Sequence, residues 1–185
     1  MESRIEQVAG NYYTFFTKRF DRIKGERIHF ASAMTMTGNN EEILRDKRAS
    51  YLDLSLFIQN HGRNIKEDLT ELWRRIVFNI AISNTDDHLR NHGFIIENGQ
   101  WRLSPAFDVN PSTDKEELAL NIDDTSGIVD FELALSVSEF FRLSAEEAES
   151  ILSRVRKAVG NWEKLAKQIG IPRAEIDMMR SAFRF

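Results

Sequence analysis

A repeating pattern of apolar residues dominates the segment from about 65 to 82. Apolar side chains recur there at intervals of three and four residues, which places them on one face of an α-helix. Asn64 followed by Glu67 has the spacing of an N-terminal capping pair, and Arg74 and Arg75 fall on the opposite, solvated side. The pattern predicts a helix over about 65–82 that buries Leu69, Leu72, Trp73, Ile76, Val77 and Ile80.

A shorter helix is predicted just before this one. Ser50 and Asp53 have the spacing of a capping box, in which each side chain bonds the backbone N–H of the other residue. Gly62 ends the pattern, as glycine commonly does at helix C-termini. The buried face of this helix would consist of Leu54, Phe57 and Ile58.

The C-terminal third is helical by the same criteria. Asp130 can cap one helix, and Ser144 with Glu147 forms a capping box for a second. The apolar period continues to Gly170, and Pro172 precedes a last helix, because proline favours the first helical turn. The predicted inward residues are Leu133, Val137, Phe140, Phe141, Ile151, Leu152, Val155, Trp162, Leu165, Ile169, Ile176, Met179 and Phe183.

The first 20 residues have a pattern typical of β-strands. Residues 3–8 alternate polar and apolar side chains, 9–11 can turn the chain, and 12–20 are aromatic and β-prone. We therefore predict a hairpin whose aromatic side chains pack in a core. Aromatic runs can also stack on nucleic-acid bases, but no basic stripe accompanies this one. The segment 21–40 contains two glycines and is expected to be irregular.

A second hairpin is predicted around Asn98-Gly99, because Asn-Gly between short apolar segments is the strongest local hairpin signal. Its strands would be 93–96 and 101–104, and 118–122 would form a further short strand. Short strands combined with several long helical segments predict an α+β fold that is mostly helical.

Composition narrows the class of protein. The chain has 185 residues, of which 42% are hydrophobic, so it is expected to be one domain or one lobe of a larger protein. It contains no cysteine, no apolar run of the ~20 residues needed for a membrane span, and no signal-peptide pattern. The net charge of −4 argues against a protein devoted to nucleic-acid phosphates. These features predict a cytoplasmic protein without membrane or direct nucleic-acid contacts.

Residues suited to phosphoryl transfer gather between 84 and 110. Asp86 to Asn91 has the spacing D-x-x-x-x-N, and Asp108 follows the Asn98-Gly99 hairpin. Transfer from ATP needs one carboxylate that orients the substrate hydroxyl, and a second carboxylate with a neutral oxygen ligand that hold Mg²⁺. Protein kinases place a helix, such a loop, a hairpin and the metal-binding aspartate in this order, so the segment predicts a kinase-like site.

Three separated motifs carry a resemblance to a specific family. SNTDDHLRNHGF (83–94), WRLSPAFDVNP (101–111) and Arg19-Phe20-Asp21-Arg22 occur in the order found in HipA-like toxins. These are serine/threonine kinases of bacterial toxin–antitoxin modules, and the similar part is their C-terminal kinase lobe. SYLDL (50–54) and the helical tail 131–185 also resemble the family, so the resemblance covers essentially the whole chain.

The resemblance implies a role for each matching residue. Asp86 matches the catalytic base, and Asn91 and Asp108 match the residues that hold Mg²⁺. The residues expected to contact ATP are Lys18, Arg19 and Phe20 in the hinge, His88, Leu89, Arg90 and Asn91 in the loop, and Phe107 with Asp108 after the hairpin. The implied cofactors are ATP and Mg²⁺, and the implied reaction transfers the γ-phosphoryl group to a protein Ser/Thr hydroxyl.

The same resemblance implies a division of the chain and its partners. Residues 1–22 would be the last hairpin and hinge of the N-lobe, and 23–185 the C-terminal lobe. The family has a phosphate loop and a strand lysine upstream of the hinge, and the 18 residues before Arg19 contain neither. The isolated chain is therefore expected to need an N-lobe, in cis or in trans. The implied partners are a helix-turn-helix antitoxin and a protein substrate, with aminoacyl-tRNA synthetases among the family's targets.

Two other functions stay open from the sequence. The chain could be a non-catalytic, kinase-derived module that grips an antitoxin or substrate. Alternatively, Asp86, Asp87, His88 and His92 could form the metal site of a hydrolase, since acidic clusters with histidine bind metals. The kinase prediction instead treats Asp87 as a supporting loop residue, gives His88 a structural task, and places His92 at the start of a strand.

Overall fold

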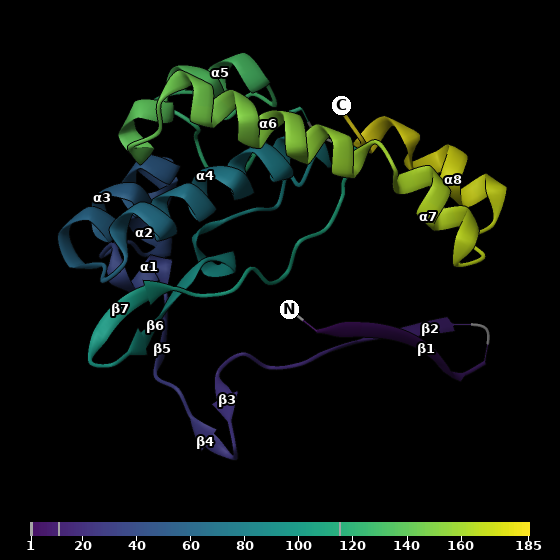
Figure 1. The fold of residues 1–185 in the computed structure, drawn as a ribbon, viewed down its shortest axis with the longest axis horizontal. Helices are drawn as coiled ribbons and strands as arrows, with labels where there is room; N and C mark the ends of the chain where they lie inside the picture. The colour runs from purple at the N-terminus through teal and green to yellow at the C-terminus, as the bar shows by residue number, and fades with distance from the viewer. Residues whose placement is uncertain (1, 11, 115) are drawn as a thin grey trace.

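The protein has a helical body with a small sheet on one side, and an N-terminal hairpin that lies apart from it (Figure 1). This computed structural model describes residues 2–10, 12–114 and 116–185. The helices are α1 (Ala33–Met36), α2 (Glu41–Asp46), α3 (Tyr51–His61), α4 (Ile65–Ala81), α5 (Phe131–Ser136), α6 (Ala145–Val159), α7 (Trp162–Gln168) and α8 (Arg173–Met179). The strands are β1 (Ser3–Ala9), β2 (Tyr12–Thr17), β3 (Arg22–Ile23), β4 (Glu26–Arg27), β5 (Phe30–Ser32), β6 (Gly93–Glu97) and β7 (Gln100–Leu103), and 3₁₀ turns cover Leu89–Asn91, Ser138–Phe141 and Arg180–Ala182. The predicted α+β, mostly helical class is confirmed.

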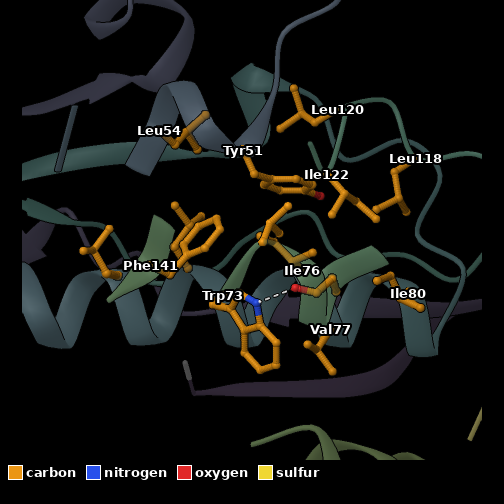
Figure 2. Close-up of a cluster of buried hydrophobic side chains, with 14 of the residues drawn as sticks. Tyr51, Leu54, Trp73, Ile76, Val77, Ile80, Leu118, Leu120, Ile122 and Phe141 are labelled. Atoms are coloured by element: carbon orange, nitrogen blue, oxygen red, sulfur yellow. Dashed lines mark hydrogen bonds between the residues drawn. The ribbon is translucent and has the colours of Figure 1, made fainter. Parts of the chain in front are cut away.

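Helix α4 is the centre of the hydrophobic core, as its apolar period predicts. Every residue of its predicted inward face is at most 1% exposed. Trp73 lies among side chains from α3, from the extended segment 118–122 and from the 3₁₀ turn at 138–141 (Figure 2). Its indole Nε1 donates to the carbonyl of Ala134 at 3.1 Å, so the one polar atom of this large buried side chain is satisfied.

Two details of α4 differ from the sequence prediction. The Asn64 side chain does not cap the helix; its Nδ2 donates to Glu67 Oε2 at 2.9 Å. Arg75 is buried rather than solvated, because its Nη2 donates to the carbonyl of Ser104 at 2.6 Å. That carbonyl follows directly after β7, a contact between segments far apart in the sequence.

The other predicted caps form as expected at three helices. Ser50 with Asp53 and Ser144 with Glu147 make complete capping boxes on α3 and α6, and the Asp130 side chain accepts the N–H of Glu132 at the start of α5. Within the described residues, no helix has both the length and the apolar character needed to cross a membrane.

The C-terminal helices are less buried than their period predicts. Helix α5 ends at Ser136 and a separate 3₁₀ turn follows, which leaves Phe140 half exposed. Leu165 and Ile169 are also more than half exposed. Trp162 is half-buried, and its ring stacks on Phe183 with centroids 4.0 Å apart and planes within 10°.

The small sheet has the order β5-β6-β7. Strands β6 and β7 form the predicted hairpin, and its turn residues Asn98 and Gly99 have φ values of 50° and 78°. Positive φ at both positions is the requirement of a type I′ turn, which Asn-Gly satisfies with little strain.

Two segments depart from their predicted conformation. The region 21–40 is not wholly irregular, since it contains the β3–β4 pair, strand β5 and helix α1. Residues 118–122 do not form a ladder, although their alternating apolar residues Leu118, Leu120 and Ile122 are buried. Burial of this segment comes from packing on the core, and its backbone pairs through isolated bridges such as Ser50 with Asn121.

The N-terminal hairpin forms in the predicted place but is not packed in a core. Strands β1 and β2 are antiparallel, with Ile5 opposite Phe15 and Gln7 opposite Tyr13. Tyr12, Tyr13 and Phe15 are 84%, 68% and 64% exposed, because no other element of the described chain covers this two-stranded ribbon (Figure 1). Part of the predicted turn, Asn11, lies outside the described residues. The domain boundary at residue 22 stays a prediction.

Candidate active site at the loop after helix α4

The predicted catalytic loop leaves α4 in a tightly fixed conformation. Ser83 has a left-handed φ of 50°, which is uncommon for a residue with a side chain. Asn84 donates from its backbone and from its Nδ2 to the carbonyl and Oδ1 of Asn79, at 2.8 and 3.1 Å. Most of the loop is buried, yet Asp86 is exposed. A rigid support therefore presents this carboxylate to solvent.

The neighbouring Asp87 anchors the loop from inside. Its Oδ2 accepts from Asn79 Nδ2 at 2.6 Å, from His92 Nε2 at 2.8 Å and from the hydroxyl of Tyr51. Burial by itself would raise the pKa of Asp87. That pKa is nevertheless lowered, by the charge and hydrogen bond of His92, by the hydrogen bond of the Tyr51 hydroxyl and by the charge of Arg75. The burial and the adjacent negative charge raise the pKa of Tyr51 well above its usual value. Asp87 is thus buried, and its Oδ2 supports the loop, as predicted.

Asp86 and Asn91 are joined by the loop itself. The Asp86 carbonyl accepts from Asn91 Nδ2 at 3.1 Å and from the N–H of His88 at 3.0 Å. The N–H of Asn91 donates in turn to the His88 carbonyl at 2.8 Å. Because Asn91 Nδ2 already donates a hydrogen bond, the side-chain oxygen of Asn91 is the atom left to bind a cation. The D-x-x-x-x-N segment from Asp86 to Asn91 therefore forms one compact, internally hydrogen-bonded loop.

The hairpin brings the chain back beside the start of β6, two residues after Asn91, and Asp108 follows further along the chain. The N–H of Ser104, just after β7, donates to the Gly93 carbonyl at the start of β6, at 2.9 Å. Asp108 lies four residues further on, is exposed, and has a left-handed φ of 54°. Asn110 Nδ2 donates to its Oδ1 at 3.0 Å. Unfavourable backbone conformations of this kind are concentrated at functional sites.

Ser83 ties the site to two distant parts of the chain. Its carbonyl accepts from the N–H of Ser112 at 3.2 Å, which holds the segment after Asp108 against the loop. Its hydroxyl accepts from Arg184 Nε at 3.1 Å, and the Arg184 N–H donates to the Ala81 carbonyl at 2.7 Å. The C-terminal tail therefore braces the point where the loop leaves α4.

An aromatic cluster connects the predicted hinge with the segment before Asp108. The ring centroids of Phe20, Phe30 and Phe107 lie 5.7 to 5.9 Å from one another. Phe30, in β5, lies directly over Gly93, where an added Cβ would come within 2.2 Å of its ring. Glycine at 93 therefore leaves room for the ring of Phe30. This ring contacts both Phe20 and Phe107, the two phenylalanines predicted to contact ATP.

The remaining hinge residues are at the surface. Lys18 Nζ lies 3.3 Å from Glu2 Oε2. Arg19 makes a bidentate pair with Asp21, at 2.7 and 2.8 Å, and Arg22 contacts the same carboxylate at 2.6 Å. The hydrogen bond from Arg19 is the largest cause that lowers the pKa of Asp21 to about 2; desolvation opposes it, and the charges of Arg19 and Arg22 add to the lowering. The Arg-Phe-Asp-Arg segment is thus held by its own charges.

The other predicted loop contacts differ in accessibility. Leu89 is 2% exposed and belongs to the core, so its side chain supports the loop. Arg90 is exposed and pairs with Glu41 at the start of α2. His88 is half-buried, and its Nδ1 has no hydrogen-bond partner in the described part of the chain.

The donor atoms suit a hard cation better than a zinc-type site. Asn91 supplies an amide oxygen and Asp108 an exposed carboxylate, and Mg²⁺ is usually bound through one or two carboxylates together with phosphate oxygens. Among the described residues, no three His, Cys, Asp or Glu side chains gather closely enough to hold a metal. Two of the four ligands of the hydrolase alternative, Asp87 and His92, are bonded to each other inside the protein.

A depression of about 480 Å³ opens beside Asp86. Arg48 and Thr85 line it together with the segment 116–119. Arg48 donates to the Ala119 carbonyl at 2.9 Å and pairs with Glu117 at 2.8 Å, which fixes the far wall. The exposed carboxylate of Asp86 thus borders a space large enough for a residue of a substrate.

Sequence reasoning missed several residues that hold this site. Tyr51 and Asn79 bind Asp87, Arg75 binds the chain before Asp108, and Phe30 joins the aromatic cluster. Asn79 carried a usable signal, because it is a polar residue three positions after Ile76 on an otherwise apolar helix face, and buried polar groups need partners. The others depend on contacts between distant segments, which periodicity does not reveal.

Comparison with known proteins identifies the family and the fold of the chain. The family model described as HipA-like C-terminal domain matches residues 1–162. The chain belongs to this family. A Haemophilus influenzae relative of the HipA-like chain, named "Putative kinase", is 32% identical over 103 residues, which are 52% of the chain and 30% of the relative.

A solved structure shares the fold. The chain from the Shewanella oneidensis HipA, HipB and operator DNA complex gives a TM-score of 0.74 at 18% identity. The match covers 97% of the HipA-like chain and 49% of the solved chain. The HipA-like chain therefore spans about half of that solved chain and less than a third of the curated relative.

Proposed function

We propose that this chain is the C-terminal lobe of a HipA-like serine/threonine kinase that uses ATP and Mg²⁺. The observation that carries the proposal is the closed loop in which Asn91 binds the Asp86 carbonyl while the Asp86 carboxylate faces solvent. Asp108, at the end of the returning hairpin, adds a second exposed carboxylate in a strained backbone conformation. This combination is what phosphoryl transfer requires of a lobe that positions metal and hydroxyl.

Each residue has a separate task in the proposed reaction. Asp86 orients the substrate hydroxyl in the depression beside it and accepts its proton at a carboxylate oxygen. Asn91 and Asp108 hold Mg²⁺ through their side-chain oxygens. Bound Mg²⁺ would neutralise charge on the transferring phosphoryl group. The buried bonds of Asp87 keep Asp86 and Asn91 in place, and positioning is the main protein contribution to this chemistry.

The nucleotide would lie between the hinge and the loop. Phe20 and Phe107 supply apolar surface there, and Lys18 and Arg19, each beside a carboxylate, lie exposed just before Phe20. From the loop, His88 and Arg90 would face the same region, with Leu89 supporting them from the core. Support comes from the aromatic cluster, which brings hinge and metal-binding segment together although 87 positions separate Phe20 from Phe107 in the numbering.

The proposed biological setting is a toxin–antitoxin module in the cytoplasm. Its protein partners would be an antitoxin with a helix-turn-helix fold and a substrate that carries a reactive Ser or Thr, such as an aminoacyl-tRNA synthetase. Support comes from the family membership and from the HipA–HipB–DNA assembly of the structural neighbour. An N-terminal lobe, in cis or in trans, would complete the enzyme.

A second candidate function is a binding module without catalysis. The exposed aromatic ribbon β1–β2 favours it, because large exposed apolar surfaces usually meet a partner. This alternative expects no saturable, Mg²⁺-dependent binding of nucleotide, whereas the kinase proposal requires it.

Replacing Asp108 with alanine is expected to weaken Mg²⁺-dependent nucleotide binding by roughly tenfold or more, and Asn91→Ala is expected to weaken it less. The reason is that Asp108 offers a charged oxygen to a hard cation and Asn91 a neutral one. NMR titration of the 185-residue chain with ATP, with and without Mg²⁺, measures both effects even at millimolar affinity.

The exposed Asp114→Ala variant serves as the control, since it removes a carboxylate from the same stretch of chain without touching the proposed ligands. It should bind Mg²⁺-ATP like the parent. Equal affinities for the parent and both ligand variants would refute the metal assignment.

A further inference from the structure

A second depression, of about 390 Å³, lies between α4 and α6, outside the loop that carries Asp86 and Asn91. Its walls are mainly apolar and come from Phe78 on α4, Ile151, Val155 and Ala158 on α6, and Ala106. Phe78 is 37% exposed, so part of this apolar wall faces solvent. A volume of this size falls within the range of small-molecule sites.

The edge of this depression is positively charged. Arg74, Arg75 and Arg154 line it, and Glu71 is the one acidic residue among its lining residues. Glu71 already binds two of the arginines, with Arg75 Nε at 3.1 Å from its Oε1. Arg154 donates to the Ser150 carbonyl, a neutral group, at 3.3 Å. Three guanidinium groups against one carboxylate leave a surplus of positive charge beside an apolar wall.

Arg75, in the wall of the depression, has one donor without a partner in the described part of the chain. Its side chain is about nine-tenths buried, and Nη2 and Nε are satisfied by the Ser104 carbonyl and Glu71. Its Nη1 is buried and has no hydrogen-bond partner in the described part of the chain. Such donors are rare in folded proteins, because an unpaired buried polar group is unfavourable.

An adjoining groove provides a useful contrast. It shares Glu71, Arg74 and Arg75 but is otherwise lined by charges of both signs, including Glu67, Asp68 and Arg102. Those charges are already paired with one another. The charges of the adjoining groove therefore largely neutralise one another, whereas the depression between α4 and α6 combines an apolar wall with more arginines than carboxylates.

We propose that the depression between α4 and α6 binds a small amphiphilic anion, namely a medium-chain carboxylate. The hydrocarbon chain packs between Phe78 and the α6 residues Ile151 and Val155. The carboxylate accepts a charge-assisted hydrogen bond from Arg154, which is stronger than a neutral one because both partners are charged, and Arg75 adds positive charge in the wall. The site is separate from the proposed kinase centre and does not depend on it, although Ala106 in its wall lies two residues before Asp108.

The test is a titration of the isotope-labelled 185-residue chain with octanoate, 1-octanol and acetate, followed by NMR. Octanoate should give saturable shifts at Ile151, Val155 and Ala106. Octanol should bind about tenfold more weakly, because it lacks the charge, and acetate should not saturate, because it lacks the chain. Arg154→Gln should lower octanoate affinity towards that of octanol and leave octanol binding unchanged.

Arg156→Gln is the matched control, since Arg156 is also exposed on α6 but lies over the ring of Phe131, 5.1 Å from its centroid. It should bind octanoate like the parent. Equal binding of octanol and octanoate, loss of octanoate affinity in both arginine variants alike, or octanoate shifts centred away from α4 and α6 would each overturn the proposal.

Discussion

Replacing Asp86 with asparagine is expected to lower phosphoryl transfer by about 10²–10⁴-fold, the usual contribution of a general base. Asparagine keeps the size of the side chain but cannot accept the hydroxyl proton. The loop should not change, because its hydrogen bonds use the Asp86 backbone carbonyl. The measurement is γ-phosphoryl transfer from labelled ATP to a protein substrate by the chain joined to an N-terminal kinase lobe.

Nucleotide affinity separates this effect from a general defect. The Asp86→Asn variant should bind Mg²⁺-ATP like the parent, since Asn91 and Asp108 hold the metal in the proposed site. Transfer at the parental rate would show that Asp86 is not the base, and loss of nucleotide binding together with transfer would point to a metal ligand instead.

Replacing the adjacent Asp87 with alanine is expected to lower the free energy of unfolding by about 3–5 kcal/mol, the usual effect of removing one partner of a buried ion pair. The variant would leave Tyr51, Asn79 and His92 buried without the oxygen that all three now contact. Denaturant unfolding of the 185-residue chain measures the change. Asp86→Ala is the matched control at the next position, and its exposed side chain should cost less than about 0.5 kcal/mol.

The buried carboxylate of Asp87 also makes the stability of the protein depend on pH, with a defined sign. Because the pKa of Asp87 is lowered in the folded protein, the unfolded chain takes up the proton first as the pH falls. Stability from this carboxylate is therefore present above about pH 4 and is lost progressively below it. An acid unfolding curve for Asp87→Ala that matches the parent in this range would contradict the assigned role.

Local chemistry made much of the fold predictable. Helices α3, α4 and α6 follow from apolar period and, for α3 and α6, from capping boxes that are complete within four residues. The β6–β7 turn follows from Asn98-Gly99, which can adopt the required positive φ values. Signals of this kind need no knowledge of the rest of the chain.

Contacts between distant segments explain the failures. Strand β5 has three residues and exists because β6, far along the sequence, pairs with it. Residues 118–122 alternate like a strand, yet their burial comes from packing on α3 and α4 without a ladder partner. The aromatic alternation of β1 and β2 indicates an apolar face but does not show what covers it, and in the structure this face is exposed.

The candidate site divides in the same way. The sequence alone predicts the loop residues Asp86 and Asn91 and the position of Asp108, because the motif is short and its parts occur in a fixed order. The residues that support the loop could not be predicted in this way. The Tyr51–Asp87 hydrogen bond joins residues 36 positions apart, and the Arg75–Ser104 hydrogen bond joins residues 29 positions apart. The roles of Asn91 and Asp108 in metal and nucleotide binding stay predictions.

Paramagnetic broadening by Mn²⁺ tests the metal and nucleotide site most directly, because Mn²⁺ accepts the same carboxylate and carbonyl oxygens as Mg²⁺. In the labelled 185-residue chain with ATP, Mn²⁺ should broaden the amide signals of Asp86–Asn91 and Phe107–Asn110 first, and Asp108→Asn should largely remove the effect. Broadening that instead centres on other exposed carboxylates, such as Asp123 and Asp124, and persists in Asp108→Asn would contradict a magnesium–nucleotide site at this loop.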